Sequence, residues 1–172
     1  MYKSQKLLTV LTSLALLASL ALLFVTLTHP LAPVGAAKDD KVARQFYLTR
    51  TTHNGAQALS ACARGYHMAS LWEIHDPSNL RYDTELGLTR DDSGFGPPAA
   101  VLGWIRTGLF ASDALAPGEA NCNAWTEAGE LQYGSAVTLI GSWNSPEERV
   151  ISPWVAEVTQ CSGSRFVWCV QD

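Results

Sequence analysis

Four cysteines at wide and uneven spacing constrain this chain more than any other feature of its sequence. Cys62, Cys122, Cys161 and Cys169 are separated by 60, 39 and 8 residues, and no two of them form a CxxC pair. Structural zinc sites usually draw their cysteines from such close pairs. An even number of cysteines in a chain that leaves the cytoplasm indicates disulfides instead. We therefore predict two disulfides, and the spacing leaves all three pairings open.

The first forty residues bear on where the chain goes. Lys3 and Lys6 precede residues 7–27, which carry no charge and consist mostly of Leu and Ala. That stretch matches the roughly 20 residues needed to span a bilayer, while the small residues 35–37 offer a signal-peptidase site. Residues 1–37 are therefore predicted to be a signal peptide or an N-terminal membrane anchor. In either case the remainder is secreted or held at the outer face of the cytoplasmic membrane.

The remainder of the chain has the size and charge of one acidic globular domain. Residues 38–43 are predicted to be a short linker and residues 44–172 a single domain, long enough to bury a core. Without the two N-terminal lysines, ten basic residues stand against sixteen acidic ones. A domain with this balance and no basic run is a poor nucleic-acid binder, so no nucleic-acid partner is expected.

The first half of the domain is predicted to hold two short helices. Apolar residues from Ala56 to Ala63 recur at helical spacing, with Leu59 and Cys62 on the same face, and Gly65 is placed to end that helix. An extended run, 67–72, should follow as a strand. Asp76 and Pro77 then resemble the cap and first residue of a second helix.

The rest of the domain alternates short apolar runs with polar, glycine-rich and proline-rich loops, a pattern typical of an α+β fold. Trp72, Trp104, Trp125 and Trp168 fall within predicted strands and are expected in the core. The last two strands are expected to pair as a closing hairpin. The predicted strands are 44–51, 101–107, 122–126, 133–140, 155–161 and 165–170, and the predicted loops are 83–98, 111–121 and 141–153.

Several motifs together resemble the C-type lectin-like domain, most closely that of exported bacterial lectin-like proteins. They are the run GYHMASL after the first cysteine, GWIRTG at 103–108, asparagine before Cys122, and FVWCVQ around Cys169. The resemblance implies two short helices and a small, mostly antiparallel sheet with long loops. It also implies neighbouring N- and C-terminal strands and the disulfides Cys62–Cys169 and Cys122–Cys161.

The sequence departs from that family where sugar-binding members hold calcium. Val158, Thr159 and Gln160 precede Cys161 in place of the family's W-N-D triplet, and nothing like E-P-N precedes Cys122. Calcium takes six to eight oxygen ligands, and these positions do not supply them. We therefore expect no cofactor, no metal and no calcium dependence.

Candidate catalytic groups are few and lack a telling arrangement. His67, His75 and Asp76 have no third ligand or partner at a recognisable spacing and are interpreted as structural. Asp91 and Asp92 are interpreted as part of a solvated loop. The chain is therefore not expected to be an enzyme, although some relatives of the fold are oxidising enzymes with reactive cysteines.

The loop between two tryptophans is the sequence's best candidate for ligand binding. Tryptophan beside polar groups in a loop is typical of a recognition patch, and the candidates are Trp143, Asn144, Glu147, Arg149 and Trp154. The predicted function is calcium-independent binding of an extracellular glycan or protein. The alternative is a structural envelope protein anchored to the membrane through residues 7–27.

Overall fold

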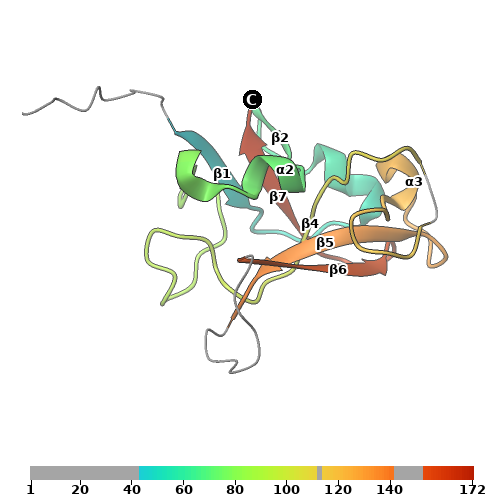
Figure 1. The fold of residues 1–172 in the computed structure, drawn as a ribbon. Coiled ribbons are helices and arrows are strands. Elements are labelled where there is room, and N and C mark those ends of the chain that lie inside the picture. Colours follow the sequence, from blue (N-terminus) through green and yellow to red (C-terminus); the bar gives the residue numbers. More distant parts are fainter. Residues whose placement is uncertain (1–42, 112–113, 142–152) are drawn as a thin grey trace, which may run out of the picture. The chain divides into compact units, whose positions relative to one another are not determined.

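The computed structural model describes residues 43–111, 114–141 and 153–172, all within the compact unit Lys41–Asp172. This part is α+β, as predicted, with a sheet as its main element and few, short helices (Figure 1). The helical elements are η1 (Gly55–Ser60), α2 (Leu71–Ile74), η2 (Pro77–Asn79) and α3 (Cys122–Trp125). The strands are β1 (Arg44–Leu48), β2 (Tyr66–Met68), β3 (Leu80–Tyr82), β4 (Gly103–Trp104), β5 (Tyr133–Leu139), β6 (Trp154–Gln160) and β7 (Phe166–Gln171).

The last strand, β7, lies at the centre of the sheet. The strand order is β3-β1-β7-β4-β5-β6, and β2 also pairs with β7. One edge of β7 bonds antiparallel β1, and the other bonds parallel β4 and then antiparallel β2. The N- and C-terminal strands of the domain therefore lie side by side, while β5 and β6 form a long ribbon beyond β4 (Figure 1).

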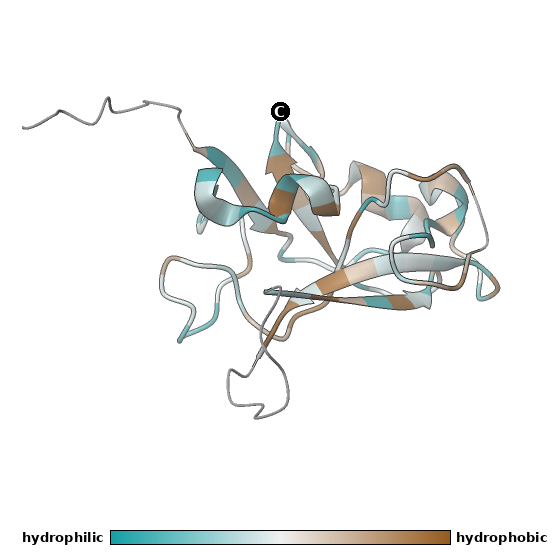
Figure 2. Ribbon diagram, in the orientation of Figure 1, coloured by the Kyte–Doolittle hydropathy of each residue, from teal (hydrophilic) through white to brown (hydrophobic). Residues whose placement is uncertain are grey.

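The core is built on the strands at the middle of the sheet. Phe46, Tyr47 and Leu48 are consecutive and all buried, so β1 is covered on both faces rather than half exposed. Val167 to Val170 of β7 are fully buried, and the hydrophobic colouring of β7 and β5 in Figure 2 follows this core. Trp104 and Trp168 are the largest fully buried side chains, as expected for core residues.

Two disulfides link the first half and the middle of the domain to its C-terminal part. Cys62, just after η1, joins Cys169 in β7, and Cys122 in α3 joins Cys161 after β6. This is the pairing that the family resemblance implies. Within the described residues no cysteine is free.

Several local predictions are wrong. The strand predicted over 67–72 ends at Met68, because α2 begins at Leu71. Leu59 is 44% exposed rather than on a buried helical face, since the helix is a 3-10 helix and Ala58 faces the core instead. The predicted closing hairpin does not form, because β6 pairs along its whole length with β5.

The strand predicted at 122–126 is instead the single helical turn α3. Its four residues, Cys122 to Trp125, all have positive φ between 49° and 63°, so the turn is left-handed. This conformation costs about 1–2 kcal/mol per non-glycine residue. The Cys122–Cys161 disulfide, the Asn121 side chain bonding the Ala124 amide at 3.1 Å, and the packing of Trp125 on Trp104 hold it in place.

The predicted signal peptide or anchor, 1–37, and the linker residues 38–42 lie outside the described residues. Across residues 43–111, 114–141 and 153–172, no helix is long and apolar enough to cross a membrane.

Candidate functional site

A single exposed tryptophan marks the most distinctive surface of the described domain. Trp72 is 86% exposed, although its helix neighbour Ile74 is fully buried. Exposing a large apolar side chain forfeits about 2 kcal/mol of burial energy, so a tryptophan held on the surface suggests a role outside folding. The prediction that Trp72 belongs to the core is wrong, because α2 turns its indole outward.

Trp72 borders a groove of about 350 Å³, a size within the range of ligand sites. The floor is apolar and comes from strands and from α2, with Ile105 and Val137 buried beneath it. Most of the other lining residues, Trp72 among them, are exposed. The lining residues are Leu71, Trp72, His75, Ile105, Arg106, Thr107, Pro117, Gly118, Ser135, Val137 and Ala156.

Hydrogen bonds hold α2 against the segments on either side of it. Arg106 donates its backbone N–H to the carbonyl of Ala69 at 2.9 Å, and it bridges in parallel to Ser70, the residue that precedes α2. On the other side, Trp154 of β6 donates its indole N–H to the carbonyl of Ile74 at 3.1 Å. The helix that carries Trp72 is therefore bonded at both ends.

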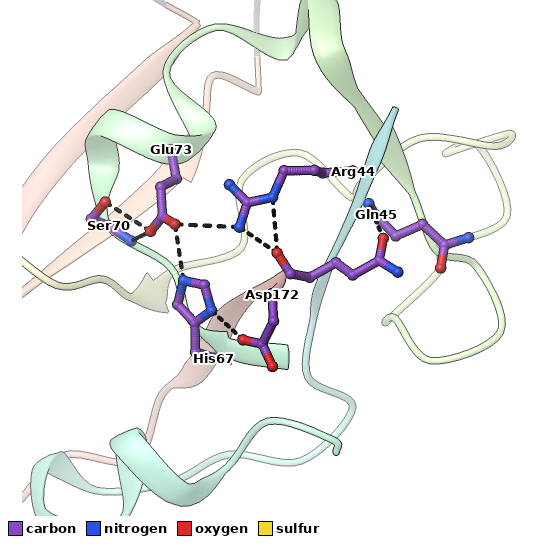
Figure 3. A network of polar contacts seen from close by, with 7 residues as sticks. Arg44, Gln45, His67, Ser70, Glu73 and Asp172 are labelled. Carbon is purple, nitrogen blue, oxygen red and sulfur yellow. Dashed lines mark hydrogen bonds and ion pairs between the residues drawn. The ribbon is translucent and has the colours of Figure 1, made fainter. Parts of the chain in front are cut away.

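A polar cluster behind α2 adds a third point of attachment (Figure 3). The Glu73 carboxylate accepts hydrogen bonds from the Ser70 backbone and hydroxyl, both at 2.9 Å, which caps the start of α2. The same carboxylate lies 2.9 Å from His67 Nε2 and forms an ion pair with Arg44 at 3.5 Å. The other ring nitrogen of His67 lies 2.7 Å from Asp172. The cluster thus joins β1, β2, α2 and the residue after β7.

Arg44 also links this cluster to the C-terminal strand. Its Nε donates to the backbone carbonyl of Gln171 at 2.9 Å, and its Nη2 donates to the same oxygen. Gln171 in turn accepts the backbone N–H of Gln45 through its side chain at 3.1 Å (Figure 3). These contacts tie the first and last strands to each other beside α2.

The pKa values of His67 and Glu73 are each shifted in the direction that favours the charged form. Burial lowers the pKa of His67, but its hydrogen bonds to Asp172 and Glu73 outweigh burial and leave the pKa raised above 6.5. Burial raises the pKa of Glu73, but the hydrogen bonds from Ser70 and His67 outweigh it and leave the pKa below 4.5. The imidazolium and the carboxylate are therefore both favoured in mildly acidic solution.

The stability that His67 contributes should therefore depend on pH. A raised folded-state pKa means that this contribution is complete below about pH 6.5 and is lost as the pH rises through the folded-state value. The Glu73 contribution is present above about pH 4.5 and is lost on further acidification. Because His67 is one-third exposed, water screens the pair, and we expect His67→Ala to cost about 1 kcal/mol or less near pH 6.

Urea unfolding of His67→Ala beside the wild-type chain at pH 6 and pH 8 tests this expectation. The gap between the two proteins should shrink at pH 8. His75→Ala is the control, because His75 is exposed and its side chain makes no hydrogen bond within the described part of the chain. A gap that is constant or grows with pH would refute the assignment of a charged His67 in the cluster.

The same geometry leaves the cluster poorly suited to catalysis. A general base needs a free ring nitrogen within reach of a proton, yet both nitrogens of His67 face carboxylates. The Ser70 hydroxyl donates to Glu73 rather than to a histidine. Among the residues that the structure describes, no group of three or more His, Cys, Asp or Glu side chains could hold a metal ion.

Most of the site residues predicted from the sequence lie outside the described part of the chain. These are Trp143, Asn144, Glu147 and Arg149. Trp154 is described, and it is half-buried, packed edge-to-face on Trp168 with ring centroids 5.0 Å apart. Its indole N–H is bonded to Ile74, so Trp154 supports the groove from behind.

The sequence analysis placed Trp72 in the core, although the sequence contains a motif that predicts a helix at this position. Ser70-x-x-Glu73 has the spacing of a capping box, and it forms one in the structure. That motif predicts a helix starting at Leu71 and ends the preceding strand. No comparable signal marks Arg106, whose place beside α2 comes from pairing between distant segments.

No protein-family model, no curated protein and no solved structure matches this chain.

Proposed function

We propose that this chain is an exported ligand-binding protein with a C-type lectin-like domain, and that it binds an extracellular glycan or protein without calcium and without catalysing a reaction. The ligand would occupy the groove beside Trp72. The two disulfides support export, because such bonds persist in oxidising compartments.

The assignment to a C-type lectin-like fold draws on arrangement as well as motifs. The two disulfides are nested, with separations of 107 and 39 residues, and the outer one reaches the last strand. The strand β1 pairs with β7, so the ends of the domain meet. The long connection from Tyr82 to Gly103 and the few short helices fit the same plan.

The observation that carries the proposal is the exposed indole of Trp72 at the edge of an apolar groove. An aromatic anchor on a rigid element gives a large contact area at little entropic cost, and such residues dominate binding surfaces. Here the rigidity comes from the capping bonds of Glu73, the Trp154 bond to Ile74 and the backbone bond of Arg106.

A printed array of glycans and short peptides, probed with the purified full-length chain, tests this proposal. Replacing Trp72 with alanine should weaken every specific interaction by about tenfold or more, as expected for an aromatic anchor. Phe95→Ala is the matched control, because Phe95 is 93% exposed and does not line the groove. It should change binding less than about twofold. Equal loss in both variants, or specific binding that survives Trp72→Ala, would refute the site.

A further inference from the structure

Resting on the proposed function, we infer that the groove beside Trp72 binds a protein partner: a peptide segment that inserts an apolar side chain and pairs an adjacent carboxylate with Arg106. This commits to an acidic, apolar peptide rather than a sugar. Three features of the described residues support this choice. The groove floor is apolar, the lining includes no carboxylate or carboxamide side chain, and the Arg106 guanidinium has no hydrogen-bond or ion-pair partner among the described residues.

The groove floor suits an apolar side chain. Leu71, Ile105 and Val137 line it, and the exposed Ala156 and Trp72 border it. Two of these residues, Ile105 and Val137, are 2% and 1% exposed, so they belong to the rigid core rather than to a loop. A packed apolar surface that can desolvate an inserted side chain is the usual centre of a protein–protein contact.

Among the described residues, the groove lining lacks the carboxylate and carboxamide side chains that commonly bind sugar hydroxyls. Sugar hydroxyls both donate and accept hydrogen bonds, so carboxylate and carboxamide groups are suitable partners. No Asp, Asn, Glu or Gln is among the eleven residues that line the groove. Two hydroxyl groups line the groove: that of Ser135, which is buried, accepts the Gly118 N–H at 2.8 Å, and that of Thr107 accepts the Leu109 N–H at 3.3 Å.

Arg106 is the cation left for a ligand. Its side chain is exposed and makes no hydrogen bond or ion pair within the described part of the chain. The other cationic candidate, His75, is followed directly in the chain by the acidic Asp76. A guanidinium with no ion-pair partner in the described part of the chain, in a groove whose described lining includes no Asp or Glu, favours an anionic partner and can bind a carboxylate through two parallel hydrogen bonds.

The position of Arg106 sets where that carboxylate must lie. The backbone of Arg106 is bonded to Ala69 and bridged to Ser70, two residues and one residue before α2. Its guanidinium and the Trp72 indole therefore belong to the rim of one groove. A ligand whose apolar side chain rests on Ile105 and Val137 would present an adjacent carboxylate to Arg106.

The test is an array of short capped peptides in which one position carries each of the twenty residue types and the next carries either Glu or Gln. The full-length chain should bind peptides with a large apolar residue before Glu and bind their Gln counterparts about five- to tenfold more weakly. Arg106→Gln should abolish this preference for Glu. Arg64→Gln is the matched control, because Arg64 is exposed and does not line the groove.

The possible results separate this inference from the proposed function. Equal binding of Glu and Gln peptides, or an unchanged preference in Arg106→Gln, overturns the inference. Specific binding to a glycan, with no peptide bound and with loss in Trp72→Ala, also overturns it but leaves the proposed function standing. A preference that is lost equally in Arg64→Gln would reflect net charge alone and would refute the role of Arg106.

Discussion

Replacing Cys62 and Cys169 together with alanine is expected to lower the free energy of unfolding by about 4–5 kcal/mol. The bond closes a loop spanning 107 residues, and constraining a loop of this length in the unfolded chain is worth about that much. It also fixes the segment after η1 against β7, the central strand. Equilibrium unfolding in guanidinium chloride, compared with the wild-type chain, measures the loss.

The other disulfide provides an internal comparison. Replacing Cys122 and Cys161 removes a shorter loop of 39 residues, so chain entropy alone predicts a loss of about 4 kcal/mol. The same change also releases the strained left-handed turn α3, which should reduce the net cost. The account would be contradicted if the Cys62–Cys169 variant lost less than about 1 kcal/mol, or less than the Cys122–Cys161 variant.

Trp168→Ala is the second large effect, with an expected loss of about 3–5 kcal/mol. The side chain is fully buried in β7, and it packs on Phe46 and Trp154 at centroid distances of 6.1 Å and 5.0 Å. Its indole N–H also donates to the carbonyl of Val137 at 3.0 Å. Removing it leaves a cavity in the core and deletes the hydrogen bond to Val137.

Trp72→Ala is the matched comparison for that experiment. The same chemical change at an exposed site should cost less than about 0.5 kcal/mol, because the Trp72 indole is 86% exposed and its helix is held by other contacts. Thermal or denaturant unfolding of the two variants side by side gives the answer. A loss at Trp72 close to that at Trp168 would mean that Trp72 is a packing residue.

The parts of the fold that follow from local chemistry could be predicted from the sequence. Asp76 caps η2 by accepting the Ser78 N–H, as expected. Gly65 has the expected positive φ, 83°, but it lies in the turn before β2, because η1 already ends at Ser60. The α+β class and the core positions of Trp104 and Trp168 also followed from patterning. In each case the signal lies within a few residues of the feature that it predicts.

The features that were missed depend on distant segments. The short gap between β6 and β7 suggested a hairpin, but β7 lies at the sheet's centre, with β1 on one edge and β2 and β4 on the other. The left-handed turn at Cys122 reflects a disulfide and packing that sequence spacing cannot show.

The candidate site was missed for the same reason. The groove combines α2, the segment after β4, the 117–118 turn and β5 with β6. The polar cluster behind it joins residues as far apart as Arg44 and Asp172. Of these features, only the capping box at Ser70 and Glu73 can be recognised in the sequence, and it predicts the helix rather than the groove.

The most direct measurement is ¹⁹F NMR of the full-length chain labelled with fluorotryptophan, titrated with the probe that binds most strongly on the arrays. Each signal can be assigned by replacing one tryptophan with phenylalanine. The account predicts that the Trp72 signal shifts with the added probe, while the signals of buried Trp104 and Trp168 stay in place. A probe that binds at saturation without moving the Trp72 signal would contradict the claim that this groove is the binding site.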